Sequence, residues 1–169
     1  KIYCPKSENL KDFKIKSKSE IYSVRGEEIE TKANVAFCVD CERELFNKDL
    51  DTENLDLVYS IYRKKHNLLS PSEIANIRKK YSLSQRSLGR FLEWGEITIN
   101  RYESGGIQDP AHNEVLVFVS NPRNMKELFE KNNQFLSKGA RERLKRKIDE
   151  LTKCESSPQL HVIIEDYIS

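Results

Sequence analysis

The sequence predicts an α+β fold, in which a small N-terminal antiparallel β domain is followed by an all-α domain and a C-terminal helical extension. Apolar and polar residues alternate from Leu10 to Cys38, which is typical of strands. From residue 49 to residue 153 apolar residues recur at helical spacing instead. The longest uninterrupted apolar run, Val115–Val119, is far shorter than the roughly 20 residues of a membrane span, so no membrane partner is expected.

Residues 1–67 are expected to hold short antiparallel strands and one linking helix. Arg25-Gly26 interrupts the alternation and predicts a turn between two strands. The period changes over residues 49–66, where an acidic first turn precedes apolar residues on one helix face: Leu55, Val58, Ile61 and Tyr62.

Residues 68–134 are predicted to form a domain of short helices. Ser70-Pro71 supplies an N-cap followed by a proline at the first helical position, which places a domain boundary near residue 68. Residues 135–169 are expected to form a basic extension with a helix from Ser137 to Lys153, followed by a tail. The expected starts of the other helices are Ser82 or Ser84, Gly95, Asp109 and Arg123.

The formal net charge of +2 conceals a segregation of charge along the chain. Residues 121–153 carry ten bases against five acids, and residues 154–169 carry three acids and no base. No acid lies between Ile74 and Leu92, where five bases are found. Bases of this kind can bind phosphates, although a run of charge is also typical of a solvated helix surface.

A motif within the helical region points to DNA. The residues Leu83-Ser84-Gln85, Leu88, Ile99, Arg101-Tyr102-Glu103 and Gly105 resemble the Xre/Cro-type helix-turn-helix family over about 23 contiguous residues. Leu88 and Ile99 are expected to hold the two helices together, and Gly89 keeps the small residue that their close packing needs. A helical hairpin without a DNA role is the alternative.

The resemblance implies that the third helix lies in the major groove. Arg101 can donate two hydrogen bonds to guanine, Asn100 can contact adenine or a phosphate, and Glu96 can accept from cytosine. Arg101 could instead pair with Glu103 or Glu93. The expected base-contacting residues are Glu96, Ile97, Asn100 and Arg101, and the expected phosphate-contacting residues are Lys80, Ser84, Gln85 and Arg86.

The cysteines predict a metal site in a reducing, cytoplasmic setting. Cys38 and Cys41 have the spacing of a zinc knuckle, and Cys4 lies where a second pair would begin, but Ser7 occupies the position of the fourth cysteine. A thioredoxin-like redox pair is disfavoured, because no βαβ pattern surrounds the cysteines.

Three explanations of the Ser7 position remain open at this point. In the first, Cys4, Cys38 and Cys41 bind Zn²⁺ with a further ligand such as Glu8, His66 or water. In the second, the ion has been lost and strand packing holds the module. In the third, Ser7 is an engineered replacement of a cysteine.

The order of these motifs resembles the MqsA family of bacterial antitoxins, also described as a YgiT-type zinc finger plus helix-turn-helix. The resemblance covers residues 1 to about 133 and rests on Val24-Arg25-Gly26, Phe37-Cys38-Val39-Asp40-Cys41, Asn47-Lys48 and Ile77-Arg78-Lys79-Lys80 leading into Leu83-Ser84-Gln85. It implies a zinc-binding domain that engages a toxin, and a dimerising domain that binds DNA and represses its own operon. Ser7 departs from the metal motif, and Ile97 stands where a base-contacting asparagine is known in the family.

The basic segment and tail extend beyond this resemblance. They look like the approach to an additional C-terminal domain, such as the SocA-like module of some prophage antitoxins, in which case toxin neutralisation could reside outside this chain. The candidate dimer surface comprises Val117, Phe118, Leu128 and Phe129, each of which could equally be core.

We therefore expect a dimeric operator-binding repressor that serves as the antitoxin of a type II toxin–antitoxin system. The alternatives are a module that mainly masks a toxin, and a prophage repressor without a toxin partner. An enzyme is not expected, because His66, His112 and His161 lie in no recognisable catalytic motif.

Overall fold

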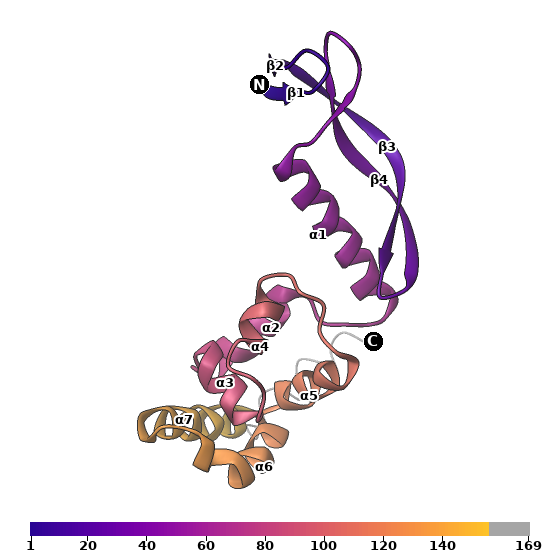
Figure 1. Cartoon of the computed structure of the whole chain (residues 1–169). Helices are drawn as coiled ribbons and strands as arrows, with labels where there is room; N and C mark the ends of the chain where they lie inside the picture. The colour runs from indigo at the N-terminus through magenta and orange to yellow at the C-terminus, as the bar shows by residue number, and fades with distance from the viewer. Residues whose placement is uncertain (156–169) are drawn as a thin grey trace, which may run out of the picture. The chain divides into compact units, whose positions relative to one another are not determined.

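The computed structural model describes residues 1–155 and confirms the α+β class. The chain forms two compact units, Lys1–Asn67 and Leu68–Ser169 (Figure 1). The tail from residue 156, including His161, lies outside the described residues. Among the helices of residues 1–155, none has the length and apolar character needed to cross a membrane.

The N-terminal unit is built on two long antiparallel strands, β3 (Phe13–Val24) and β4 (Glu27–Cys38), which form a twisted ribbon (Figure 1). They meet at the predicted turn, where Arg25 and Gly26 have φ values of 53° and 82°. Positive φ at both central positions matches the twist of the flanking strands. Each strand has 12 residues, so the strands are longer than the short ones expected. The short strand β5 (Glu44–Leu45) pairs with β4, whereas β1 (Ile2–Cys4) and β2 (Asn9–Lys11) form a separate antiparallel pair.

Helix α1 (Lys48–Lys65) packs against this ribbon. Asn47 caps it by accepting hydrogen bonds from the backbone N–H groups of Asp49 and Leu50. In the middle of the helix the buried Asn54 side chain bonds both the N–H and the carbonyl of Asn34 in β4, at 2.9 and 3.0 Å. These two bonds fix the position of the helix along the strand.

The helical unit comprises six α-helices within its described residues: α2 (Pro71–Lys80), α3 (Gln85–Phe91), α4 (Thr98–Glu103), α5 (Pro110–Ser120), α6 (Pro122–Asn132) and α7 (Lys138–Glu155). A 3₁₀ turn, Asn133–Phe135, precedes α7. Polar caps begin the helices where the sequence predicts them, since Ser70 forms a capping box with Glu73 and Ser84 and Asp109 accept backbone N–H bonds. Helix α4 begins at Thr98, later than expected, because Gly95 and Glu96 belong to the preceding turn.

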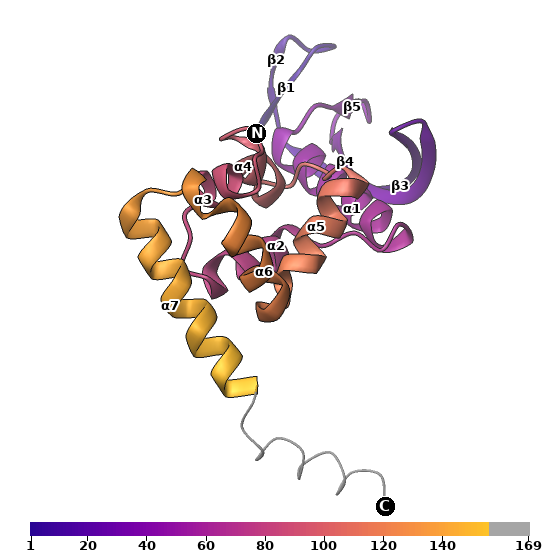
Figure 2. The same ribbon diagram turned by 90° about the horizontal axis from the view of Figure 1, so that it is seen from below.

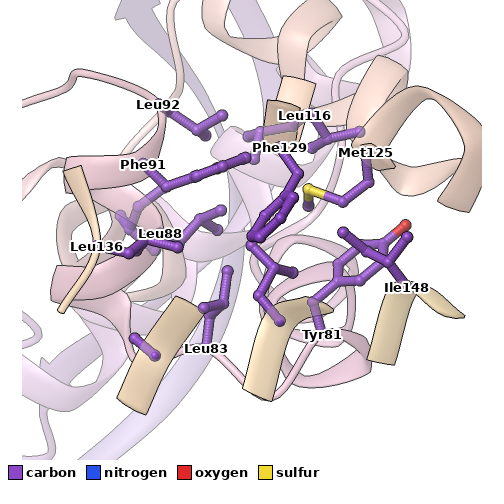
Figure 3. Close-up of a cluster of buried hydrophobic side chains, with 14 of the residues drawn as sticks. Tyr81, Leu83, Leu88, Phe91, Leu92, Leu116, Met125, Phe129, Leu136 and Ile148 are labelled. Atoms are coloured by element: carbon purple, nitrogen blue, oxygen red, sulfur yellow. The ribbon is translucent and has the colours of Figure 1, made fainter. Parts of the chain in front are cut away.

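One hydrophobic core holds the helical unit together (Figure 3). Leu88, Phe91 and Ile99 lie in it with Leu116 and Met125 from the later helices, all fully buried. The extension contributes to the same core, because α7 packs against α6 (Figure 2) and buries Ala140, Leu144 and Ile148, together with Leu136 just before the helix. The segment from residue 135 to residue 155, expected to be a separate extension, is thus joined to the helix-turn-helix by shared packing.

Candidate metal centre and nucleic-acid interface

Three cysteines meet at one end of the N-terminal unit. Cys4 ends β1, Cys38 ends β4, and Cys41 lies in the turn that follows β4. This turn is tight, since the N–H of Glu42 bonds the carbonyl of Cys38 at 3.0 Å. The three sulfur atoms lie within 4.8 Å of one another, and no disulfide joins them.

The geometry of the three thiols fits a tetrahedral metal ion. Zn–S bonds of about 2.3 Å place two sulfurs of a tetrahedral site about 3.8 Å apart. The Sγ atoms of Cys4 and Cys41 are separated by 3.6 Å, and both Cys4 and Cys38 are buried. The sulfurs therefore require little movement to bind one ion.

Ser7 acts on this site through Cys4. Its hydroxyl and backbone N–H hydrogen-bond to the Cys4 sulfur and lower the pKa of Cys4 to about 6. A thiol with this pKa is largely thiolate at neutral pH, which is the form that binds metal. Ser7 thus supports the cysteine cluster even though serine does not replace a fourth thiolate.

The expected fourth ligands lie elsewhere among the described residues. His66 caps the C-terminal end of α1, where its Nε2 is 2.7 Å from Glu27 Oε2 and its ring contacts Tyr62. Glu8 lies in the turn between β1 and β2, and its carboxylate does not lie within 4.8 Å of all three cysteine sulfurs. Neither His66 nor Glu8 therefore completes the site. Of the three further ligands named from the sequence, water is the one left.

The helix-turn-helix has the packing that its motif predicts. Leu88 and Ile99 are fully buried between α3 and α4. A Cβ atom on Gly89 would lie only 3.3 Å from the carbonyl oxygen of Gly95, which explains the need for a small residue there. Trp94 stacks on His112 with 3.9 Å between ring centroids, so α5 supports the turn that leads into α4.

A polar network that the sequence analysis missed connects α2, α3 and α4. Arg78 donates two hydrogen bonds to the Glu103 carboxylate, at 2.6 and 2.7 Å, and Gln85 donates a third at 2.8 Å. Gln85 in turn accepts a hydrogen bond from the Asn100 amide at 3.1 Å. Both charged residues were visible within the quoted motifs, but their pairing across 25 positions depends on the fold.

The network also determines what surrounds Arg101. Its guanidinium lies over the Tyr102 ring, 5.2 Å from the centroid, on the exposed side of α4. Glu103, considered from the sequence as a partner of Arg101, is held by Arg78 instead. Glu93, the other candidate, has its carboxylate 3.5 Å from the Asn132 amide.

The other predicted DNA-contacting residues differ in how freely they are presented. Ile97 is 76% exposed, and Asn100 is exposed beside it. Ser84 caps α3 and Gln85 begins it, as expected for residues near a phosphate. Lys80 points elsewhere, because its amine donates to the carbonyl of Ser120 at the end of α5.

Two of the predicted contacts bind each other. Arg86, expected to contact phosphate, lies 2.9 Å from the carboxylate of Glu96, expected to contact a base. Arg90 binds the same carboxylate from the next turn of α3.

The family comparison agrees with this combination of a cysteine cluster and a helix-turn-helix. A family model described as the antitoxin component of the bacterial toxin–antitoxin system, MqsA, matches residues 2–128. The chain belongs to the MqsA antitoxin family. The match spans the strands, the three clustered cysteines, the helix-turn-helix and most of α6, whereas α7 lies beyond it. No curated protein matches the chain.

As a member of the MqsA family, the protein is an antitoxin whose expected partner is a toxin. Of the candidate dimer residues, Val117 and Phe118 are 45% and 46% exposed on α5. Phe129 is buried in the core and Leu128 packs against that core, so these two residues serve the fold of the helical unit. The apolar surface of α5 is thus the part of the predicted dimer surface that remains accessible.

Proposed function

We propose that this MqsA-family antitoxin is a sequence-specific repressor that binds the operator of its own operon as a homodimer. The observation that carries the proposal is the exposed surface of α4, where Ile97, Asn100 and Arg101 project from a rigid helix-turn-helix. The acidic residue of that helix, Glu103, is turned inward and neutralised by Arg78. The charge that α4 presents to DNA is therefore that of Arg101.

Each residue has a contact suited to its chemistry. Arg101 donates two hydrogen bonds to O6 and N7 of guanine, while Asn100, oriented by Gln85, bonds adenine or a phosphate. Ile97 packs against a thymine methyl. Ser84 and Gln85 contact the phosphate backbone and set the register, as does Arg86 once it leaves Glu96. Lys80 reaches a phosphate only after its amine releases Ser120.

Toxin binding is assigned to the N-terminal unit. The support, besides the family, is an edge of β3 that pairs with no strand among residues 1–155, since β3 pairs with β4 alone and ends the strand order β3-β4-β5. Ile15 and Ile21 are 54% and 65% exposed on this strand. An open edge with exposed apolar side chains is suited to strand pairing with a partner protein.

The cofactor we propose is Zn²⁺, held by the thiolates of Cys4, Cys38 and Cys41. The 3.6 Å sulfur separation and the low pKa of Cys4 support it. The ion would join β1 to the turn after β4 and stabilise a unit whose core around the cysteines is small.

An electrophoretic mobility shift with the promoter DNA of its own operon tests the repressor proposal. The protein should shift this DNA at low salt, where phosphate contacts are strongest, and Arg101→Ala should abolish the sequence-specific shift without weakening toxin binding. Arg143→Ala, an exposed arginine on α7, is the matched control and should behave like the wild type.

Failure of the wild-type protein to shift this DNA at low salt would overturn the proposal. The chain would then act mainly as a module that masks a toxin. The promoter DNA also tests the dimer. A homodimer requires two half-sites about one helical turn apart in the DNA that it shifts.

A further inference from the structure

An exposed cluster of three charged residues stands at the entrance to α4. Arg86 and Arg90 lie one turn apart on α3, and Glu96 lies in the turn that leads to α4. Arg86 Nη2 is 2.9 Å from Glu96 Oε2, and Arg90 Nε donates to Glu96 Oε1 at 2.9 Å. Each carboxylate oxygen therefore serves a different arginine.

This arrangement bears on DNA because a guanidinium binds carboxylate and phosphate with the same donors. Arg86 belongs to the predicted phosphate-contacting surface at the start of α3, and Arg90 extends that surface by one turn. While Glu96 occupies both guanidinium groups, a phosphate must displace the carboxylate to bind them. The carboxylate also repels the phosphate backbone that approaches α4.

We propose that Glu96 sets the DNA specificity of this protein by holding Arg86 and Arg90 as an internal substitute for phosphate. The proposal rests on the proposed operator binding and adds Arg90 to the phosphate-contacting residues. The restraint weakens non-specific binding more than operator binding, because non-specific binding relies on phosphate contacts alone, whereas operator binding also draws on base contacts and depends less on Arg86 and Arg90. Stable binding then requires the additional base contacts of Arg101 and Asn100, so the restraint raises the ratio of operator to non-specific affinity.

The alternative role for Glu96 is the acceptance of a hydrogen bond from cytosine, as expected from the sequence. Both of its oxygens are already engaged by guanidinium groups, which are stronger partners than a base amine. The hydrogen bonds from Arg90 and Arg86 lower the pKa of Glu96, so the carboxylate is ionised throughout the neutral range.

The test compares Glu96→Gln with wild type on two duplexes of equal length, one with the promoter region of its own operon and one with that sequence scrambled. Fluorescence anisotropy measures both affinities from about 50 to 300 mM KCl, a range over which phosphate contacts respond strongly to salt. Glu93→Gln removes the same charge from the same loop and is the matched control, since its side chain contacts Asn132 rather than the two arginines.

The expected result is a rise of about tenfold in affinity for the scrambled duplex, together with a smaller rise for the promoter duplex. The slope of log K against log salt should steepen by about 0.9 for each guanidinium that gains a phosphate. Adding Arg86→Gln and Arg90→Gln to Glu96→Gln should remove the gain. Glu96→Asp, which is too short to hold both arginines, should give an intermediate affinity, and Glu93→Gln should leave the ratio of the two affinities unchanged.

Two results would overturn the inference. One is a loss of promoter affinity in Glu96→Gln with no gain on the scrambled duplex, which would make Glu96 a base-contacting residue. The other is equal binding of the variant and the wild type to both duplexes, with the Trp94 fluorescence spectrum confirming that the variant is folded. Failure of the wild-type protein to prefer its promoter duplex would instead count against operator binding itself, which is a separate result.

Discussion

Removing the charge of Glu103 should destabilise the helical unit and disorder the surface of α4. The side chains of Arg78 and Glu103 are only 15% and 8% exposed, and two short hydrogen bonds join them. In Glu103→Gln the Arg78 guanidinium stays in place but loses its counter-charge and one of its two acceptors. Gln85 loses its charged acceptor as well, so the orientation of Asn100 is weakened.

The size of the effect follows from burial. Breaking a buried ion pair by removing one partner costs about 3–5 kcal/mol. Arg78 retains some exposure, and the glutamine keeps one acceptor oxygen, so we expect a loss of about 2–3 kcal/mol in the free energy of unfolding. For a unit of this size the loss corresponds to a fall of roughly 10 °C or more in melting temperature.

Tryptophan fluorescence during urea unfolding measures this loss in the helical unit alone. Trp94 is the single tryptophan of the chain, and it stacks on His112 inside that unit. Glu150→Gln, which breaks an exposed pair with Lys147 on α7, is the control and should leave the transition almost unchanged. A loss below about 1 kcal/mol in Glu103→Gln would refute the assignment of Glu103 as a buried anchor of α4.

The same variant gives a pH dependence with a defined sign. Burial opposes ionisation of Glu103, but hydrogen bonds from Arg78 and Gln85 outweigh it and lower the pKa of the carboxyl below its usual value. A lowered folded-state pKa contributes stability above the unfolded pKa of about 4.3, and this stability is lost as the pH falls through the folded value. The difference between wild type and Glu103→Gln should therefore be full at pH 7 and shrink below about pH 4.

Four further substitutions test the metal centre and the two packed units. Ser7→Cys should complete a four-thiolate site and tighten Zn²⁺ binding, measured by chelator competition. The absorption spectrum of the Co²⁺-substituted protein should shift toward that of four sulfur ligands. Unchanged metal affinity would contradict the position assigned to Ser7. Asn54→Ala removes two buried hydrogen bonds to the β4 backbone and should cost the N-terminal unit about 2 kcal/mol, seen as faster amide exchange in β4 and α1. Gly106→Ala should cost the helical unit about 1–3 kcal/mol, because its Cβ would lie 2.8 Å from the Arg101 carbonyl oxygen. Gly139→Ala has room in α7 and should stabilise the unit by roughly 0.5–1 kcal/mol. Similar effects of the two alanines on urea unfolding would contradict this difference.

The sequence predicted most of the local structure, since local rules govern it. The Arg25-Gly26 turn, the Ser70 and Ser84 caps and the period of α1 depend on residues close together in the chain. The candidate cysteines were also recognisable, because the spacing of Cys38 and Cys41 is itself the signal. The separate β1–β2 pair was missed, since strands of three residues carry too few alternations to be detected.

The interface residues show where local patterns stop being informative. Arg101 and Asn100 were predicted as base contacts from their positions in a motif, and no pattern could place Glu103 on Arg78 or Glu96 between two arginines. A charged side chain can pair with any partner that the fold brings within about 4 Å, and such partners lie as far as 38 positions away along the chain, as for Lys65 and Glu27.

The sequence by itself thus determined the fold class, the candidate metal-binding cysteines and the helix-turn-helix, each of which follows from the spacing of residues along the chain. Only the tertiary structure decided which of those residues are available. It brought Cys4 to Cys38 and Cys41, turned Lys80 toward Ser120, and buried the stripe of α7 in the core of the helical unit. The physical reason is that periodicity specifies which face of an element is apolar, whereas the contacts of a polar side chain are set by packing between distant elements.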